Sequence, residues 1–330
     1  MPVGVYLIRN GSCPAVSRTR VTAFSRILTR YGIGRPRSRE IVARGEIVYR
    51  VRRRNRTACW AAAVLVVLLV SGPESAVAET IRISGTGGAI GTMRTLGEAF
   101  HMTDPGIRVD ILPGMGSSGS VRAVMAGRLD IGLSARALSG EERAQGLVET
   151  RYARTPFVFA VNPDLKMTGL TPEGLAAIYA GKRDWENGKR IRLVLRPRED
   201  TDIPALKGIS PAMSAAVDIA LRRRGMIVAT TDHDAVDTIE RVPGAFGGTT
   251  LALLLSEKRA LRILSLDGIP PSVRAMADRS YPGSKTFFMV TKNNPPPAVR
   301  RFVDFVRSPA GSAILAENGQ EAVRHGGSPP

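Results

Sequence analysis

The sequence predicts an α/β fold with mostly parallel sheets, and three observations carry this prediction. From residue 79 onward, short apolar runs alternate with helix-like segments, which is the order typical of α/β domains. Several of the helix-like segments carry paired start and stop signals. Two consecutive strands are each followed by a glycine-rich turn and a helix. A chain of 330 residues that is 43% hydrophobic and 23% charged is long enough for about two globular domains.

The expected strands are apolar or alternating runs of five or six residues, at 80–84, 107–112, 130–134, 156–161, 191–196, 226–230 and 286–291. The helices with the clearest signals begin with Ser or Thr, continue with proline and stop at a glycine; they are 171–181, 210–225 and 308–319. A hydroxyl can cap the free N–H groups of the first turn, and glycine tolerates the left-handed conformation at the helix end.

The basic charge of the chain is concentrated at its N-terminal end. The net charge is +18, of which residues 1–78 hold +11 through 14 Arg against three acids, so residues 79–330 carry +7. Within that segment, RRRNR at 52–56 is followed by a 13-residue apolar core at 58–70 and by AVA at 76–78. This order is typical of a secretory signal peptide, and the core falls short of the roughly 20 residues that a membrane anchor needs. We therefore expect residues 51–78 to be a signal peptide, cleaved after Ala78, that directs the protein to the periplasm.

Residues 1–50 fit no signal peptide, and we expect them to be a non-native or disordered extension, with translation starting at a valine such as Val51. A basic arm for nucleic acid is the alternative, but it would lie on an exported chain, so no nucleic-acid partner is expected. Both cysteines, Cys13 and Cys59, precede the cleavage site. The exported protein would then contain no disulfide and no membrane span. We expect it to be a monomer.

The two glycine-rich turns are GMGSSG at 114–119 and SGTGGAIG at 84–91. The first fits the dinucleotide fingerprint G-x-G-x-x-G, and Arg136 arrives where a 2′-phosphate partner would stand. Three observations oppose a dinucleotide site. The strand before this turn is the second of the exported chain, the helix after it is short, and exported proteins rarely use nicotinamide cofactors. A Walker phosphate loop is excluded, since Ser120 and Val121 stand where Lys and Ser or Thr are required. We expect no cofactor.

Glycine and serine also turn and cap well in loops without any ligand. Two such loops after consecutive strands, however, bring free N–H groups and hydroxyls to one edge of a sheet, where open α/β sheets bind ligands. The sequence contains no recognisable catalytic or metal-binding pattern, because His101, His233 and His325 lie far apart in the sequence and no H-E-x-x-H or G-x-S-x-G motif is present. The residues support neither an enzyme nor a metal site.

The motifs together resemble the phosphate-binding-protein-like solute receptors of ABC importers, in the type II periplasmic binding protein superfamily. The resemblance covers most of residues 80–320 and rests on ISGTGG at 83–88, GSSG at 116–119, GRLDIGLS at 127–134, IYAGK at 178–182 with Asp184 and Trp185, PGAFG at 243–247 and SPAG at 308–311. It implies two α/β lobes, each a mostly parallel sheet flanked by helices, joined by two crossing strands. Lobe 1 would be 79–157 plus 284–330, and lobe 2 would be 158–283.

The resemblance also implies an anion site between the lobes. Its donors would be Thr86, Gly88 and Ala89 from the first loop and Ser117, Ser118 and Gly119 from the second, with Arg196 as the family's phosphate-pairing arginine. A guanidinium fork suits a tetrahedral oxyanion. The expected partners are a small inorganic or organic anion and an ABC permease.

Two departures from the family pattern concern the ligand. The family has an aspartate directly after the position of Ser134, whereas this chain has Ala135 and then Arg136. After its arginine the family has a small loop rich in Gly and hydroxyls, whereas this chain reads REDTD at 198–202. Three acids would repel an oxyanion unless they face solvent or pair with Arg136 or Arg198. If Arg136 points into the cleft, the site would favour a fully ionised anion or a carboxylate-bearing solute over protonated phosphate.

The leading functional prediction is a periplasmic solute-binding protein of a phosphate-type ABC importer, without catalysis. The alternative is a sensory or accessory protein that uses the same fold and binds no phosphate, with the loop at 199–202 contacting a protein partner. An oxidoreductase ranks third.

Overall fold

The computed structural model describes residues 42–43, 46–47 and 79–323. The chain divides into two units, Met1–Glu74 and Ser75–Pro330. In the first unit only β1 (Val42–Ala43) and β2 (Glu46–Ile47) are described, as an antiparallel pair. The expected signal peptide at 51–78 and most of the extension at 1–50 therefore lie outside the described residues.

The second unit begins with alternating strands and helices, as the sequence predicts. Its first part contains β3 (Glu79–Gly85), α3 (Gly87–Thr103), β4 (Ile107–Ile111), α4 (Gly116–Met125), β5 (Ile131–Ser134) and α5 (Gly140–Ala144). Strand β3 pairs in parallel with β4 on one side and with β5 on the other. The same part of the fold is completed at the C-terminal end by α12 (Pro297–Val306), α13 (Pro309–Glu317) and β14 (Glu321–Ala322).

The middle of the chain forms a second α/β part. It contains β7 (Gly169–Leu170), α6 (Pro172–Ala180), β8 (Arg192–Leu195), α7 (Asp202–Lys207), α8 (Pro211–Arg222), β9 (Ile227–Val228), α9 (Asp232–Arg241), β10 (Ala245–Thr250), α10 (Leu251–Ser256), β11 (Arg262–Ile263), β12 (Ser265–Leu266) and α11 (Val273–Ala277). Strand β8 pairs in parallel with β9 and β10.

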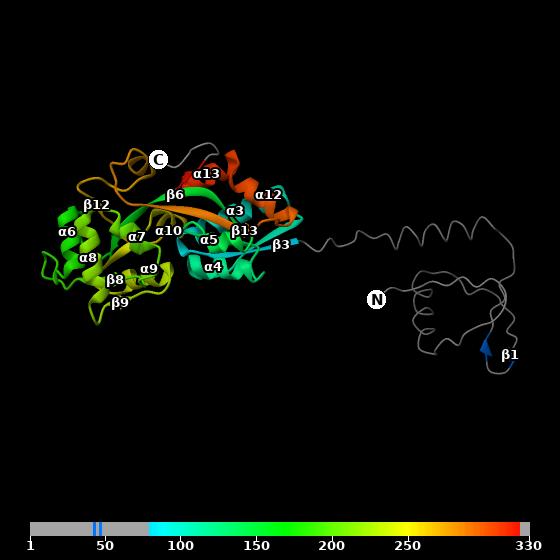
Figure 1. Ribbon diagram of the computed structural model, residues 1–330, viewed down its shortest axis with the longest axis horizontal. Coiled ribbons are helices and arrows are strands. Elements are labelled where there is room, and N and C mark those ends of the chain that lie inside the picture. The colour runs from blue at the N-terminus through cyan, green and yellow to red at the C-terminus, as the bar shows by residue number, and fades with distance from the viewer. Residues whose placement is uncertain (1–41, 44–45, 48–78, 324–330) are drawn as a thin grey trace, which may run out of the picture. The chain divides into compact units, whose positions relative to one another are not determined.

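Two long strands join the two parts. These are β6 (Leu147–Val161) and β13 (Ser284–Lys292), which pair antiparallel with each other. Strand β13 also pairs with β5, and the far end of β6 pairs with β10, so one ten-stranded sheet runs through both parts. In Figure 1, β6 and β13 cross between a half that carries α6 and α8 and a half that carries α3, α4 and α12. This is the two-lobed α/β architecture that the sequence predicts.

Each half has its own apolar core. One core gathers residues such as Ile83, Phe100 and Phe302 between the β3–β5 part of the sheet and its helices. The other gathers Phe159, Tyr179 and other apolar side chains between the β8–β10 part and α6 and α8. Separate cores are what two lobes require if they are to move as bodies about β6 and β13.

Most expected elements are present, with three corrected boundaries. Strand β6 begins nine residues before the expected start at 156, because its first half, LVETRYART, has neither an apolar run nor a regular alternation of polar and apolar residues. Helix α8 ends at Arg222 instead of Gly225, since Arg223 leaves the helical conformation and its guanidinium donates to the Tyr179 carbonyl at 2.7 Å.

The third correction concerns the glycine-rich turns, because most of each segment lies inside a helix. Helix α3 already begins at Gly87 and α4 at Gly116. A Cβ on Gly91 would lie 2.3 Å from the Ser256 hydroxyl oxygen and 2.9 Å from the Ser256 Cβ, so this glycine lets α3 approach the end of α10. The glycines of the first segment thus serve close packing as well as turning.

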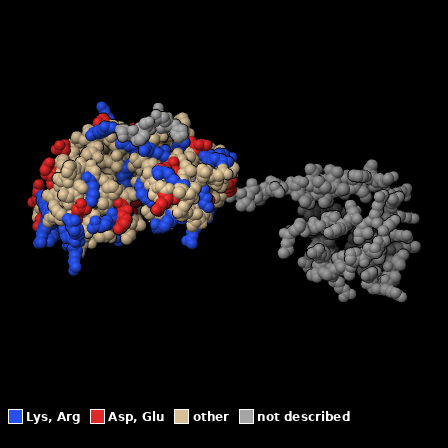
Figure 2. Space-filling model, in the orientation of Figure 1, with Lys and Arg blue, Asp and Glu red and all other residues tan. Residues whose placement is uncertain are grey.

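The charged side chains of the described part are mixed in sign. Acidic and basic residues are interspersed over both halves on the face shown in Figure 2. Within the described residues, no helix is both long and apolar enough to cross a membrane.

Candidate functional site

The N-termini of α3 and α4 open into one cavity between the two halves of the sheet. The cavity has a volume of about 210 Å³ and is lined from the first half by Thr86, Ser117, Ser118 and Gly119, four of the eight predicted ligand residues. The second half contributes Glu199, Asp200, Thr201, Thr230 and Asp232. Gly88, Ala89, Arg136 and Arg196 do not line it.

The serines of α4 divide into a structural one and an accessible one. Ser117 is buried, and its hydroxyl oxygen accepts the Ala135 N–H at 2.9 Å, which ties the start of α4 to the end of β5. Ser118 is exposed at the cavity. The free donors of this helix N-terminus are therefore backbone N–H groups and the Ser118 hydroxyl.

Arg196 is buried directly behind the cavity. Its side chain is 5% exposed and donates to the Asp200 carboxylate at 2.6 Å and to the Ala229 carbonyl at 2.9 Å. Its Nε has no hydrogen-bond partner. Burial would lower the pKa of Arg196, but the carboxylates of Asp232, Asp200 and Asp202 together raise it, so the guanidinium is charged.

A second buried cation, Lys285 on β13, faces the same carboxylates. Its ammonium pairs with Asp202, and both side chains are 3% exposed. Burial raises the pKa of Asp202 to about 6, although Lys285 opposes this shift. Two of the three acids of the 198–202 segment, Asp200 and Asp202, are therefore paired, with Arg196 and Lys285 and not with Arg136 or Arg198. The third, Glu199, is exposed.

Asp232, the first residue of α9, reaches across the cavity to α3. Its Oδ2 accepts the Gly87 N–H at 2.6 Å and the Thr86 hydroxyl at 3.1 Å, while its Oδ1 lies 3.8 Å from the Arg196 guanidinium. Burial would raise the pKa of Asp232, but Lys285, Arg196 and the two hydrogen bonds lower it, so the carboxylate is ionised. A carboxylate of the protein thus sits on the helix N-terminus where the sequence predicts a ligand anion.

Arg136 lies at the rim and is paired. Its guanidinium donates to both carboxylate oxygens of Glu142, at 2.7 and 2.8 Å, and approaches the Ser118 hydroxyl at 3.4 Å. This fork lowers the pKa of Glu142 to about 2. Because its charge is neutralised here, Arg136 gives no support to the expectation that the site selects a fully ionised anion.

Sequence reasoning missed Asp232 and Lys285. Asp232 follows the β9 strand as α9 begins, so it lies at the same carboxyl-terminal edge of the parallel strands as the glycine-rich segments. That placement could have marked it. Lys285 lies within a crossing strand, and its sequence gives no signal of a buried ion pair.

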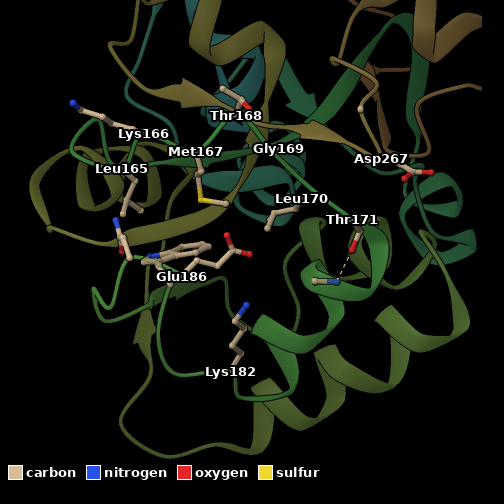
Figure 3. A pocket seen from close by; sticks show the side chains of 14 residues that line it. Leu165, Lys166, Met167, Thr168, Gly169, Leu170, Thr171, Lys182, Glu186 and Asp267 are labelled. Carbon is tan, nitrogen blue, oxygen red and sulfur yellow. Dashed lines mark hydrogen bonds between the residues drawn. The ribbon is translucent and has the colours of Figure 1, made fainter.

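A larger cavity lies in the second half. It has a volume of about 600 Å³ and is lined by the 165–171 segment together with Lys182, Trp185 and Glu186. In Figure 3 apolar side chains such as Met167 and Leu170 and the charged ends of Lys182 and Glu186 surround it. None of the predicted ligand residues lines this cavity, and no cluster of charged donors converges in it.

The described histidines make local contacts. His101 bonds the Ile107 carbonyl at 2.8 Å, and His233 pairs with Glu257 at 2.7 Å, which raises the pKa of the imidazole. His325 lies outside the described residues. No group of three or more His, Cys, Asp or Glu side chains that could hold a metal ion occurs in the described part of the chain.

Comparison with known proteins agrees with this architecture. Two phosphate-binding proteins named PstS are similar in sequence. The one from Borreliella burgdorferi is 24% identical over 213 residues, covering 62% of this chain and 76% of the relative, and the one from Bacillus subtilis is 25% identical over 249 residues, covering 71% and 77%.

A crystal structure of a putative phosphate ABC transporter substrate-binding protein with bound phosphate, from Clostridium perfringens, has the same fold. It is 22% identical, with a TM-score of 0.65, and the match covers 74% of this chain and all of that one. A family profile described as the PBP superfamily domain matches residues 71–310, which is most of the chain. The protein therefore belongs to the PBP superfamily, and its described part has the two-lobed α/β fold of that superfamily's phosphate-binding structures.

Proposed function

We propose that this protein is the solute-binding protein of a phosphate-type ABC importer, and that it binds a small oxyanion such as phosphate between its two lobes without catalysis. The observation that carries the proposal is the convergence of the α3 and α4 N-termini, with Arg196 behind them, on one cavity of about 210 Å³. Helix N-termini offer free N–H groups and a positive dipole end to an anion, and a guanidinium adds a full charge. The similarity to proteins named as phosphate-binding supports phosphate as the first candidate ligand.

We propose lobes of 79–157 plus 284–330 and of 158–283, which close on the ligand by bending β6 and β13. The positions of the two cores support this division, except at α10, which follows β10 and packs against α3. Helix α10 therefore packs across the proposed boundary between the lobes.

The site residues remain a proposal. The hydroxyls of Thr86 and Ser118 and the Arg196 guanidinium would contact the oxyanion, with Ser117 and Gly119 shaping the start of α4. Backbone N–H groups at Gly88 and Ala89 would contribute only if the start of α3 rearranged, because neither residue lines the cavity and the Ala89 N–H donates to the Thr86 carbonyl at 3.1 Å. Arg136 would contribute only if its pair with Glu142 opened. Export through cleavage after Ala78, a permease partner and a monomeric state belong to the same proposal.

The test is calorimetric titration of the protein, purified from cells that express the full chain, with phosphate, arsenate and sulfate. A one-to-one binding heat and a rise in melting temperature are expected, because a ligand that binds only the folded state stabilises it by about 2.7 kcal/mol at 100 times its Kd. Absence of both signals with every anion would refute the proposed function.

The variant Ser118→Glu tests whether the anion binds in this cavity. It places a carboxylate at the accessible wall of the cavity. Repulsion from a bound anion about 5 Å away, at an effective dielectric constant of about 20 to 40, should lower the affinity roughly 15- to 300-fold. Ala215→Glu makes the same change of charge on the exposed face of α8 and serves as control. Equal effects of the two variants would show that the cavity is not the site.

One observation favours the second candidate, a sensory or accessory protein that binds no phosphate. Three carboxylates, those of Asp200, Asp202 and Asp232, surround two buried cations at the cavity. This candidate gains support if neither the protein nor a variant lacking the Asp232 carboxylate binds any anion of the panel.

A further inference from the structure

The N-terminus of α3 depends on another element for its capping. This helix is 17 residues long, its N-cap residue Thr86 makes no side-chain capping bond, and its first turn contains no acid. The first-turn residues Gly87, Gly88 and Ala89 are buried, so water does not replace the missing cap. The group that satisfies the Gly87 N–H is the carboxylate of Asp232, at 2.6 Å.

Helix α9 does not need this carboxylate for its own start. Its N-cap Thr231 accepts the Asp234 N–H, and Asp234 accepts the Thr231 N–H in return, which is a complete capping box. The Asp232 side chain is therefore free to cap α3, a helix that begins 145 residues earlier in the chain.

The surroundings of the Asp232 carboxylate are those of a bound anion. The N-termini of α3 and α9 both point toward it, and the Arg196 guanidinium lies 3.8 Å from its second oxygen. Arg196 keeps one buried Nε without a hydrogen-bond partner, although a better-placed oxygen could accept from it. The site is therefore built for an anion that Asp232 only partly replaces.

We infer that Asp232 is an internal competitor for the ligand: its carboxylate occupies the oxyanion position on α3, and an incoming anion binds by displacing it. The inference rests on the proposed function, in that it assumes the cleft takes an anion. Asp232 would then set the affinity of the cleft, and because α3 and α9 belong to different lobes, it would also hold the empty protein closed.

Competition makes a specific prediction for variants that remove the carboxylate. Asp232→Ala should bind phosphate about 10- to 100-fold more tightly than the unaltered protein. This factor corresponds to the free energy of the one charge-assisted hydrogen bond that the ligand no longer has to break. The affinity for sulfate should rise by the same factor, because displacing the Asp232 carboxylate costs the same free energy for every ligand. Asp232→Asn keeps the side-chain size and an acceptor oxygen, and should give an intermediate gain.

The comparison of phosphate with sulfate at pH 7 separates competition from direct recognition. Phosphate carries a proton that a carboxylate could accept, whereas sulfate does not. If Asp232 contacted the bound ligand as an acceptor, its removal would weaken phosphate binding and spare or improve sulfate binding. That pattern, or unchanged affinity for both anions, would overturn the inference.

A charge-matched control is Glu199→Gln. Glu199 is an exposed acid on the wall of the same cavity, and it makes no ion pair with the described residues and no hydrogen bond with α3. Glu199 is exposed, so water and salt screen its charge more than that of the buried Asp232, and its removal should raise affinity less than Asp232→Ala does. A gain equal to that of Asp232→Ala would also overturn the inference.

A second measurement needs no ligand at all. Spin labels on Arg128→Cys and Arg198→Cys, two exposed positions in different lobes, report the interlobe distance once Cys13 and Cys59 are replaced by Ser. The labelled protein should be closed without phosphate, and addition of Asp232→Ala should lengthen the ligand-free distance. If the ligand-free distances are the same, the inference fails while the proposed function stands. If Asp232→Ala opens the lobes but no anion binds, Asp232 does hold the lobes closed and the proposed function fails.

Discussion

Replacing Lys285 by methionine would leave the Asp202 carboxylate buried without its main partner. The two side chains are each 3% exposed, and removing one member of such a pair costs about 3–5 kcal/mol. Arg196 stays 3.6 Å from Asp202 and compensates in part, so a loss near 3 kcal/mol is expected. Methionine nearly conserves the volume of the lysine stem, which keeps a packing defect out of the measurement.

The loss should depend on pH in a defined direction. Burial already raises the pKa of Asp202 to about 6 from an ordinary value of 3.8, and Lys285 is the strongest influence that opposes this shift. Without Lys285 the folded-state pKa rises further, while that of the unfolded chain does not change. An acid with a raised folded-state pKa gives stability that is present at low pH and is lost as pH rises through that pKa. Stability of Lys285→Met should therefore keep falling above pH 6, by about 1.4 kcal/mol per pH unit.

Urea unfolding between pH 5 and pH 8 measures both effects. Asp202→Asn combined with Lys285→Met removes the buried charge and should recover most of the loss and flatten the pH dependence. The reasoning would be refuted if Lys285→Met lay within about 1 kcal/mol of the unaltered protein with an identical pH profile.

Three further predictions concern other parts of the fold. Gly85→Ala should destabilise by about 3 kcal/mol, because the new Cβ would lie 2.0 Å from a backbone carbonyl oxygen of β5; a melting-temperature loss under 2 °C would contradict this. Ser308→Ala should cost about 1 kcal/mol in urea unfolding through loss of the α13 cap, and no change would argue against that hydrogen bond. The Arg136 fork lowers the pKa of Glu142 from 4.5 to about 2, so its stabilisation is present above pH 4.5 and is lost as pH falls toward 2. Glu142→Gln should remove that acid dependence in a pH series of melting temperatures, and an unaltered series would exclude the pair as its source.

The helix signals in the sequence were reliable because they act locally. Thr171, Ser210 and Ser308 each accept a backbone N–H of the first turn, as their hydroxyls predict, and Gly181 and Gly319 adopt positive φ angles at the helix ends. The first half of β6 has neither an apolar run nor a regular alternation, and it is defined by its partner β13, which lies more than a hundred residues away. Pairing over that distance leaves no local pattern.

The candidate site was predicted in outline only. The positions of Thr86, Ser117, Ser118 and Gly119 at one cavity follow from the rule that the carboxyl ends of parallel strands share an edge. The partners of Asp200 and Asp202 were not predictable, because the cations that neutralise them come from different strands and one of them was not a candidate. Asp232 was not a candidate either, because its contact with α3 joins residues 145 positions apart and depends on how the two lobes close.

A crystal structure of the protein grown with phosphate tests the central claim most directly. The account predicts a tetrahedral anion in the cavity of about 210 Å³, within hydrogen-bond distance of the α3 N-terminus and of Arg196, with the Asp232 carboxylate moved off the Gly87 N–H. An anion bound elsewhere, or phosphate in the cavity with Asp232 still on Gly87, would contradict it.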